Sequence, residues 1–279
     1  MPDDLRTQAG KKLRGLNLAS CDQQQIIEGD CLQIMRSLPS ECVDAVVTSP
    51  PYNIGIRYNS YSDKMPRSDY LAWLSKVGVE LNRLLRPNGS LFLNVGFTGA
   101  DPWIAMDVAS AFRNDFVLQN NISWIKSISI DQDTVGHFKP INSRRYLNNN
   151  FEHLFHFTKS GNVEIDRLSI GVPYKDKSNI ARWDHAKQDR RCAGNTWFIP
   201  YETVRSKSQK FDHPAGYPAE LVQRCLKLVG LEEGNVLDPF LGAGTTLVAA
   251  AMCGWSGVGI EIDPIYAKAS RDRIKGMYE

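Results

Sequence analysis

Five consecutive residues of this chain combine hydroxyl groups, two prolines and an aromatic ring: Thr48, Ser49, Pro50, Pro51 and Tyr52. They follow an apolar run that is short, rich in valine and bounded by turn residues, as in a buried parallel strand. The prolines end this strand and stiffen the turn, because each fixes φ and lacks an N–H donor. The turn therefore holds the ring at the carboxyl end of a strand, where open α/β sheets bind their ligands.

This turn supplies what a reaction at an exocyclic amino group requires, namely acceptors for the amine and a flat surface for its ring. Ser49 and the carbonyl of Pro50 are the acceptors, and Tyr52 is the stacking surface. A proline-rich peptide ligand is disfavoured, because such ligands lie in polar, disordered segments and this turn follows a hydrophobic strand. A plain structural turn would suffice if the motif stood alone.

A second motif, residues 234–246 (GNVLDPFLGAGTT), runs from a short strand through a glycine-containing turn into a helix-forming stretch. Gly242 and Gly244 allow the backbone to approach a ligand closely, and the helix start offers free N–H groups. The turn lacks the third glycine of the dinucleotide fingerprint. A further strand ends in Glu261, 23 residues after Asp238. An acid there commonly binds ribose hydroxyls, so we favour a nucleoside cofactor over a solvated carboxylate.

Together, the two motifs resemble those of the amino-methyltransferases that act on DNA and use S-adenosyl-L-methionine. The catalytic motif precedes the cofactor motif, an order that resembles the β group of that superfamily. The resemblance covers residues 26–158 and 211–275. It implies an α/β fold with a doubly wound, mostly parallel sheet of the class I methyltransferase type, an antiparallel final hairpin and an inserted target-recognition lobe.

The predicted organisation follows from this resemblance. It comprises a flexible N-terminus (1–25), a catalytic half (26–159), a target-recognition region (160–212) and a cofactor-binding half (213–279). The hydrophobic pattern predicts strands at 26–29, 90–95, 121–126 and 151–158, and helices at 31–38, 68–86 and 219–229. Asp101-Pro102 predicts the start of another helix. Three segments, 53–67, 127–150 and 160–212, show neither period and are predicted to be loops, the first of them over the active site.

The resemblance also implies where the cofactor binds. Asp30 lies where family members contact the adenine amino group, and it can cap the following helix as well. His213-Pro214 lies where family members line the methionine side, although Tyr217 stands where many carry lysine. The predicted cofactor-binding residues are Asp30, Cys31, Thr48, His213, Pro214, Asp238, Pro239, Phe240, Gly242, Gly244, Thr245 and Glu261.

The distribution of charge favours double-stranded DNA as the partner. The net charge is only +2, but basic residues outnumber acidic ones in 126–146 and in 160–212. Such segments can track phosphates, although each charge taken singly also fits a solvated loop. The predicted DNA-binding residues are Lys139, Arg144, Arg145, Arg182, Arg190 and Arg191, with Trp183, Trp197 and Phe198 as candidates for stacking on bases.

Several kinds of chemistry are excluded by what the sequence lacks. No proline precedes a cysteine, so the Pro-Cys nucleophile of ring-carbon cytosine methylation is missing. The six cysteines form no C-x-x-C pair and are typical of a reduced, cytoplasmic protein. His153 and His156 lack the companions of a metal site, so no metal is expected. No signal peptide or membrane-spanning run is found.

The predicted reaction is transfer of a methyl group from S-adenosyl-L-methionine to the exocyclic N4 of a flipped cytosine. The resemblance implies this base, since Ser in the first motif position is more typical of N4-cytosine enzymes and Asp or Asn of N6-adenine enzymes. An N6-adenine DNA methyltransferase is the main alternative. An RNA or protein amide methyltransferase is disfavoured by the permuted motif order, and a nicotinamide-dependent oxidoreductase by the missing glycine. A non-catalytic DNA-binding module would not need the second motif. A homodimer and a separately acting restriction endonuclease are left open as partners.

Overall fold

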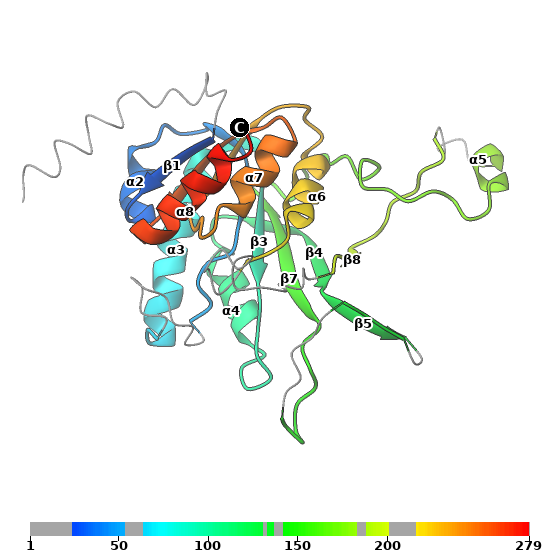
Figure 1. Ribbon diagram of the computed structural model, residues 1–279, viewed down its shortest axis with the longest axis horizontal. Helices are drawn as coiled ribbons and strands as arrows, with labels where there is room; N and C mark the ends of the chain where they lie inside the picture. Colours follow the sequence, from blue (N-terminus) through cyan, green and yellow to red (C-terminus); the bar gives the residue numbers. More distant parts are fainter. Residues whose placement is uncertain are drawn as a thin grey trace, which may run out of the picture.

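The computed structural model describes residues 24–53, 64–130, 133–136, 142–182, 188–200 and 216–278. Its centre is an eight-stranded sheet with the order β1-β10-β9-β2-β3-β7-β4-β8 (Figure 1). The strands are β1 (Gln24–Glu28), β2 (Val43–Thr48), β3 (Leu85–Val95), β4 (Val117–Ile125), β7 (Phe151–Thr158), β8 (Thr196–Phe198), β9 (Asn235–Asp238) and β10 (Ser256–Glu261). Within this sheet, only β7 runs antiparallel to its neighbours, β3 and β4. The predicted α/β class, the mostly parallel sheet and the antiparallel hairpin are confirmed.

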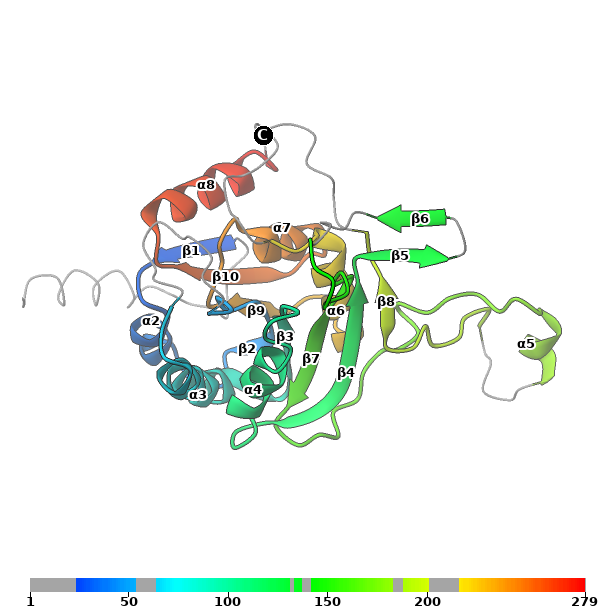
Figure 2. The same ribbon diagram turned by 90° about the horizontal axis from the view of Figure 1, so that it is seen from below.

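Helices cover both faces of this sheet, as Figure 2 shows. One face carries α2 (Cys31–Ser37), α3 (Arg67–Leu84) and α4 (Ile104–Ala111), and the other carries α6 (Ala219–Val229), α7 (Thr245–Met252) and α8 (Pro264–Lys275). Both layers bury apolar side chains against the sheet. All six residues of β2 are buried, as expected for a central parallel strand, although Asp44 and Thr48 interrupt its apolar pattern. Among the described residues, none of the helices has the length and apolar character needed to cross a membrane.

Several elements differ from the sequence prediction. Asp101-Pro102 does not begin a helix, because α4 starts at Ile104. Asp101 instead closes a turn with Thr98 and forms an ion pair with Arg67. The strand β3 begins directly after α3 and therefore includes Pro87-Asn88-Gly89, which precede the predicted strand. Its register with β2 shifts at these residues. The helix α8 was missed, although Asp263 caps it and Pro264 occupies its first turn.

Two of the predicted loops contain secondary structure. Residues 127–150 include the antiparallel hairpin of β5 (Ser127–Ile130) and β6 (Asp133–Gly136). Residues 160–212 include α5 (Ser178–Arg182), which extends away from the sheet in Figures 1 and 2, and β8, which pairs with β4. The proposed stacking role of Trp197 is wrong, because its side chain is buried in the core and its Nε1 donates to the carbonyl of Gly194.

A buried histidine of β7 makes the stability of this fold depend on pH. The ring of His156 stacks on Phe92, and its two nitrogens face Ser90 and Asn120. Burial lowers the pKa of His156 from 6.5 to about 4. The unfolded chain therefore binds a proton that the folded chain excludes. This contribution to stability is complete above the unfolded pKa and is lost as the pH falls toward the folded one.

We expect the free energy of unfolding to drop by about 1.4 kcal/mol from this residue alone between roughly pH 7.5 and 5.5. Urea denaturation of the wild type and of His156→Gln at both pH values is the measurement. The glutamine amide does not titrate, so the free energy of unfolding of the variant should change less between the two pH values, by that amount. Equal pH dependence in the two proteins would show that His156 is not the group responsible.

Candidate active site

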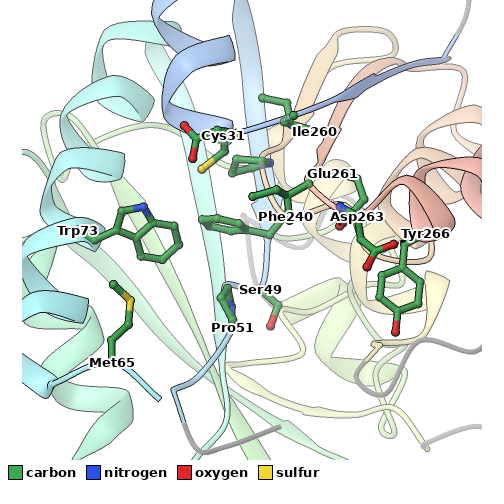
Figure 3. A pocket seen from close by; sticks show the side chains of 14 residues that line it. Cys31, Ser49, Pro51, Met65, Trp73, Phe240, Ile260, Glu261, Asp263 and Tyr266 are labelled. Atoms are coloured by element: carbon green, nitrogen blue, oxygen red, sulfur yellow. Dashed lines mark hydrogen bonds between the residues drawn. The ribbon is translucent and has the colours of Figure 1, made fainter. Parts of the chain in front are cut away.

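The carboxyl ends of β1, β2, β9 and β10 meet at one edge of the sheet, and a pocket opens there. The two sequence motifs meet at this edge although they are far apart in the chain, because β2 and β9 are neighbouring parallel strands. Both motifs contribute side chains to the pocket (Figure 3). It is lined by Gly29, Asp30, Cys31, Ser49, Pro51, Met65, Trp73, Pro239, Phe240, Ile260, Glu261, Ile262, Asp263 and Tyr266.

One buried carboxylate joins the two motifs. The Asp238 side chain accepts hydrogen bonds from Thr48 Oγ1 at 2.6 Å, Thr246 Oγ1 at 2.5 Å, the Phe240 amide at 3.0 Å and Tyr217 OH at 3.1 Å. Burial raises the pKa of Asp238 above its usual value, against the effect of these donors. Asp238 and Thr48 are not among the pocket-lining residues, so they shape the site from beneath it.

Tyr217 supplies a contact that the sequence did not predict. Its hydroxyl lies 2.6 Å from Thr246 Oγ1 as well as against Asp238, and burial raises the pKa of Tyr217 well above its ordinary value. It therefore stays protonated and donates to the carboxylate. The segment that leads into α6 is tied to the second motif through this residue.

Glu261 lines the pocket, and two backbone amides fix the position of its carboxylate. Its Oε2 accepts from the Gly242 amide and its Oε1 from the Asp263 amide, both at 2.8 Å. Burial raises the pKa of Glu261, and the two amides oppose that effect. Each carboxylate oxygen retains a further lone pair for a ligand. The arrangement can accept hydrogen bonds from a pair of neighbouring hydroxyls.

The glycines of the second motif act through backbone geometry. Gly242 has φ +53°, a conformation that L side chains rarely adopt, and this points its amide at Glu261. Gly244 has φ +78°, and a Cβ there would lie 3.0 Å from the Cβ of Ser270 in α8. Neither glycine, nor Thr245, lines the pocket. Direct cofactor contacts by these three residues remain predictions.

The rest of the pocket is largely apolar. Trp73 and Phe240 lie with their ring centroids 5.5 Å apart, and Figure 3 places them on the side away from Tyr266. Burial raises the pKa of the Cys31 thiol to about 12, so it packs as a neutral group. Asp30 caps α2 by accepting from the Gln33 amide at 2.9 Å and also reaches the pocket. Its predicted second role, contact with an adenine amino group, stays a prediction.

The first motif presents Ser49 and Pro51 to the pocket. The carbonyl of Pro51 accepts from Tyr70 OH at 2.6 Å, which fixes the turn against α3. Pro50 is buried and is not among the residues that line the pocket. Tyr52 does not line the pocket, and its hydroxyl contacts Ser49 Oγ at 2.8 Å. A predicted stacking role for Tyr52 therefore depends on a base that enters beside the pocket.

Three residues around Tyr52 were not predicted from the sequence. Asn94 Nδ2 donates to Tyr52 OH at 3.0 Å and to Glu152 Oε2 at 2.7 Å. Tyr52 OH lies 3.2 Å from Glu152 Oε2, and Lys126 Nζ lies 2.8 Å from Glu152 Oε1. Only Asn94, near the end of a predicted strand beside β2, carried a usable signal. Glu152 reaches the same edge because β7 runs in the opposite direction.

The remaining predicted residues lie apart from the pocket or outside the described part of the chain. Lys139, His213 and Pro214 are outside it, and for Arg182 only the backbone, at the end of α5, is described. Arg144 and Arg191 are exposed. Arg145 is exposed above the ring of Tyr146, and Arg190 donates to the carbonyls of Leu168 and Ser169. In the described residues, no group of three acidic, histidine or cysteine side chains is arranged to hold a metal.

Known proteins share this sequence pattern and architecture. The chain is 25% identical to the Type II methyltransferase M.ScaI of Streptomyces caespitosus, over 98% of this chain and 88% of that protein. It is 27% identical to the DNA adenine methyltransferase YhdJ of Escherichia coli K12, over 91% and 83%. Both alignments cover most of each protein.

Solved structures share the fold. The PvuII DNA methyltransferase (cytosine-N4-specific) superposes with a TM-score of 0.66 at 19% identity, over 92% of this chain and 93% of that one. TTHA0409 of Thermus thermophilus, solved with S-adenosyl-L-methionine, gives 0.60 at 24% identity, over 91% and 93%. The sequence model of the N6/N4 methyltransferases, described as DNA methylase, matches residues 43–272. Because this match spans most of the chain, the protein belongs to the DNA methylase family.

Proposed function

We propose that the protein transfers a methyl group from S-adenosyl-L-methionine to the exocyclic N4 of cytosine in double-stranded DNA. The observation that carries the proposal is the position of Ser49, a neutral hydrogen-bond acceptor, at the rim of a pocket that also holds Glu261. The relatives named above are DNA methyltransferases, which supports DNA as the substrate. When bound, the cofactor supplies an electrophilic methyl group on a sulfonium.

The lining of the pocket fits a nucleoside cofactor. Glu261 offers two fixed carboxylate oxygens, as the two ribose hydroxyls require. Phe240 and Trp73 offer flat apolar surface for a purine ring. Asp30 can accept from the adenine amino group. Residues of both halves of the chain thus hold the cofactor at the carboxyl edge of the sheet, next to Ser49.

Ser49 and the carbonyl of Pro50 act on the target amine. An arylamine is a poor nucleophile, because its lone pair is delocalised into the ring. Two acceptors that bind its hydrogens favour a pyramidal nitrogen with a free lone pair. Alignment of that nitrogen with the methyl group supplies much of the rate. The base must leave the duplex to reach the site, with Tyr52 as its stacking surface.

The choice of cytosine rests on the type of residue at position 49. Serine is neutral, and the pyrimidine is the smaller of the two bases. The N6 of adenine is the second candidate, and the relative YhdJ, described as a DNA adenine methyltransferase, supports it. Both bases place an amine beside a ring nitrogen, so the same acceptors serve either. Relatives named Type II methyltransferases support a place in restriction–modification, with a separate endonuclease.

The base assignment predicts the product. Unmethylated duplex DNA treated with the protein and cofactor should contain N4-methylcytosine, because the neutral acceptor Ser49 suits this base. Digestion to nucleosides and mass spectrometry identify the methylated atom. N6-methyladenine as the only product would show that adenine is the target base, and the proposed mechanism of amino methylation would still stand. 5-Methylcytosine would overturn the proposed mechanism, since it needs a thiol nucleophile next to the base.

The ribose assignment predicts a loss of cofactor affinity in Glu261→Gln. The amide brings an N–H donor toward the Gly242 or Asp263 amide and removes an acceptor from the pocket. We expect S-adenosylhomocysteine to bind roughly tenfold or more weakly in calorimetry, because hydrogen bonds to a charged group are worth about 1.5–3 kcal/mol. The matched control is Glu28→Gln, an exposed residue directly beside Glu261 in the sheet. Unchanged affinity in Glu261→Gln would exclude the ribose contact.

The phosphate contacts predict a change in salt dependence. Arg145 and Arg191 are exposed cations on the segments proposed to bind DNA. The logarithm of the binding constant falls as the logarithm of the salt concentration rises. Each single change to Ala should make this slope less steep by about 0.9, because a protein with one phosphate contact fewer releases fewer counterions from the DNA. Fluorescence anisotropy with a duplex over a range of salt concentrations measures this slope. Lys268→Ala, an exposed change on α8, is the control. A slope equal to that of the wild type for both arginine variants would place the DNA elsewhere.

A further inference from the structure

A chain of polar side chains connects Ser49 to an ion pair outside the pocket. It runs from Ser49 through the hydroxyl of Tyr52 to Glu152, and Glu152 pairs with Lys126. Ser49 and Tyr52 belong to the first motif, Lys126 directly follows β4, and Glu152 lies in β7. Asn94 of β3 bridges Tyr52 and Glu152. The chain thus links the proposed acceptor of the target amine to a fixed negative charge.

The direction of the hydrogen bonds in this chain can be derived from the residues at its outer end. The Glu152 and Lys126 side chains are only 16% and 21% exposed, and their charged atoms lie 2.8 Å apart. A carboxylate in such an ion pair only accepts hydrogen bonds. The amide of Asn94 must therefore turn its nitrogen toward Glu152, and its second N–H reaches Tyr52 OH.

Tyr52 determines which way the hydroxyl of Ser49 points. Its pKa is raised well above the ordinary value by burial, and further by the charge of Glu152, so the phenol keeps its proton. The single phenolic proton goes to Glu152, and the oxygen accepts from Asn94. The 2.8 Å contact with Ser49 then requires the proton of Ser49. The lone pairs of Ser49 Oγ are left for another donor.

The packing around Tyr52 leaves its hydroxyl little freedom. A Cβ at Gly96 would lie 2.7 Å from Tyr52 Cε2 and 3.3 Å from the carboxyl carbon of Glu152. A glycine is therefore required where the chain passes the ring and the carboxylate. The amide oxygen of Asn94 is buried and has no hydrogen-bond partner among the described residues, so its nitrogen alone serves the chain. These contacts hold the ring of Tyr52 in one place.

We propose that Glu152 is a positioning residue for methyl transfer, which orients the hydroxyls of Tyr52 and Ser49 so that Ser49 presents only acceptors to the target amine. The inference rests on the proposed transfer to an amino group. Without the carboxylate, the chain can reverse, and the proton of Ser49 then points toward the amine nitrogen. A donor there binds the lone pair that has to attack the methyl group.

The test is a double-mutant cycle on the single-turnover rate of methyl transfer. The proteins are the wild type, Glu152→Gln, Tyr52→Phe and the double variant, and the substrates are labelled S-adenosyl-L-methionine and amplified, hence unmethylated, bacterial DNA. Glu152→Asp serves as the conservative variant. Glu233→Gln, an exposed change at the opposite edge of the sheet, is the matched control. Calorimetry with S-adenosylhomocysteine shows whether each variant keeps its folded cofactor site.

We expect Glu152→Gln and Tyr52→Phe each to slow transfer by roughly ten- to a hundredfold, because a hydrogen bond tied to a charged group is lost. The double variant should be no slower than the slower single variant, since both changes break the same chain. Glu152→Asp should restore part of the rate. Cofactor affinity should stay within about twofold of the wild type in all of them, because the pocket that holds Glu261 is untouched.

Three results would overturn the inference. The first is a Tyr52→Phe protein as fast as the wild type, a result that does not depend on the folding of any Glu152 variant. The second is a double variant in which the two losses multiply, which indicates independent structural effects. The third is a Glu152→Gln protein that transfers at the wild-type rate. A wild-type protein that methylates no DNA would instead reject the proposed function itself.

Discussion

The buried carboxylate of Asp238 is the group on which the rest of the site depends. A carboxylate in this position costs free energy unless donors surround it. Here three hydroxyls and one backbone amide surround it. The hydroxyls belong to Thr48 at the end of β2, Tyr217 before α6 and Thr246 in the first turn of α7, and the amide is that of Phe240 in the turn between β9 and α7. The carboxylate therefore fixes the relative position of both motifs. Each carboxylate oxygen has two donors, so loss of one donor would leave one buried lone pair unsatisfied and weaken the link between the two motifs.

The adjacency of β2 and β9 explains how one site can be built from distant segments. Parallel strands present their carboxyl ends at the same edge, so Ser49 and Glu261 share a pocket whichever motif comes first in the chain. The order of the two motifs along the sequence can therefore differ without a change in the geometry of the site, because that geometry depends on the neighbouring strands of the sheet. The motif order that resembles the β group is therefore compatible with the same site.

The sequence predicted the central features of the site because they rest on local rules. A strand followed by two prolines, or by glycines and a helix, determines its own geometry, and Ser49 and Glu261 lie where these rules place them. Trp197 was misassigned, since burial of an aromatic side chain depends on the pairing of β8 with β4, which no local pattern signals. Glu152 was missed for a similar reason, because only the antiparallel course of β7 brings it to Tyr52. The residues predicted to bind DNA have no such test, as their role depends on a partner.

The two sides of the site use different kinds of hydrogen bond. On the cofactor side, backbone amides hold Glu261, and their direction is fixed by the fold. On the side proposed for the target base, the hydroxyls of Ser49 and Tyr52 can each donate or accept. Their direction must be imposed by a group that does only one of the two, and a paired carboxylate meets that condition. A carboxylate in place of Ser49 would bring charge next to the base, whereas in the proposed role Glu152 acts through Tyr52 and leaves a neutral oxygen facing the amine.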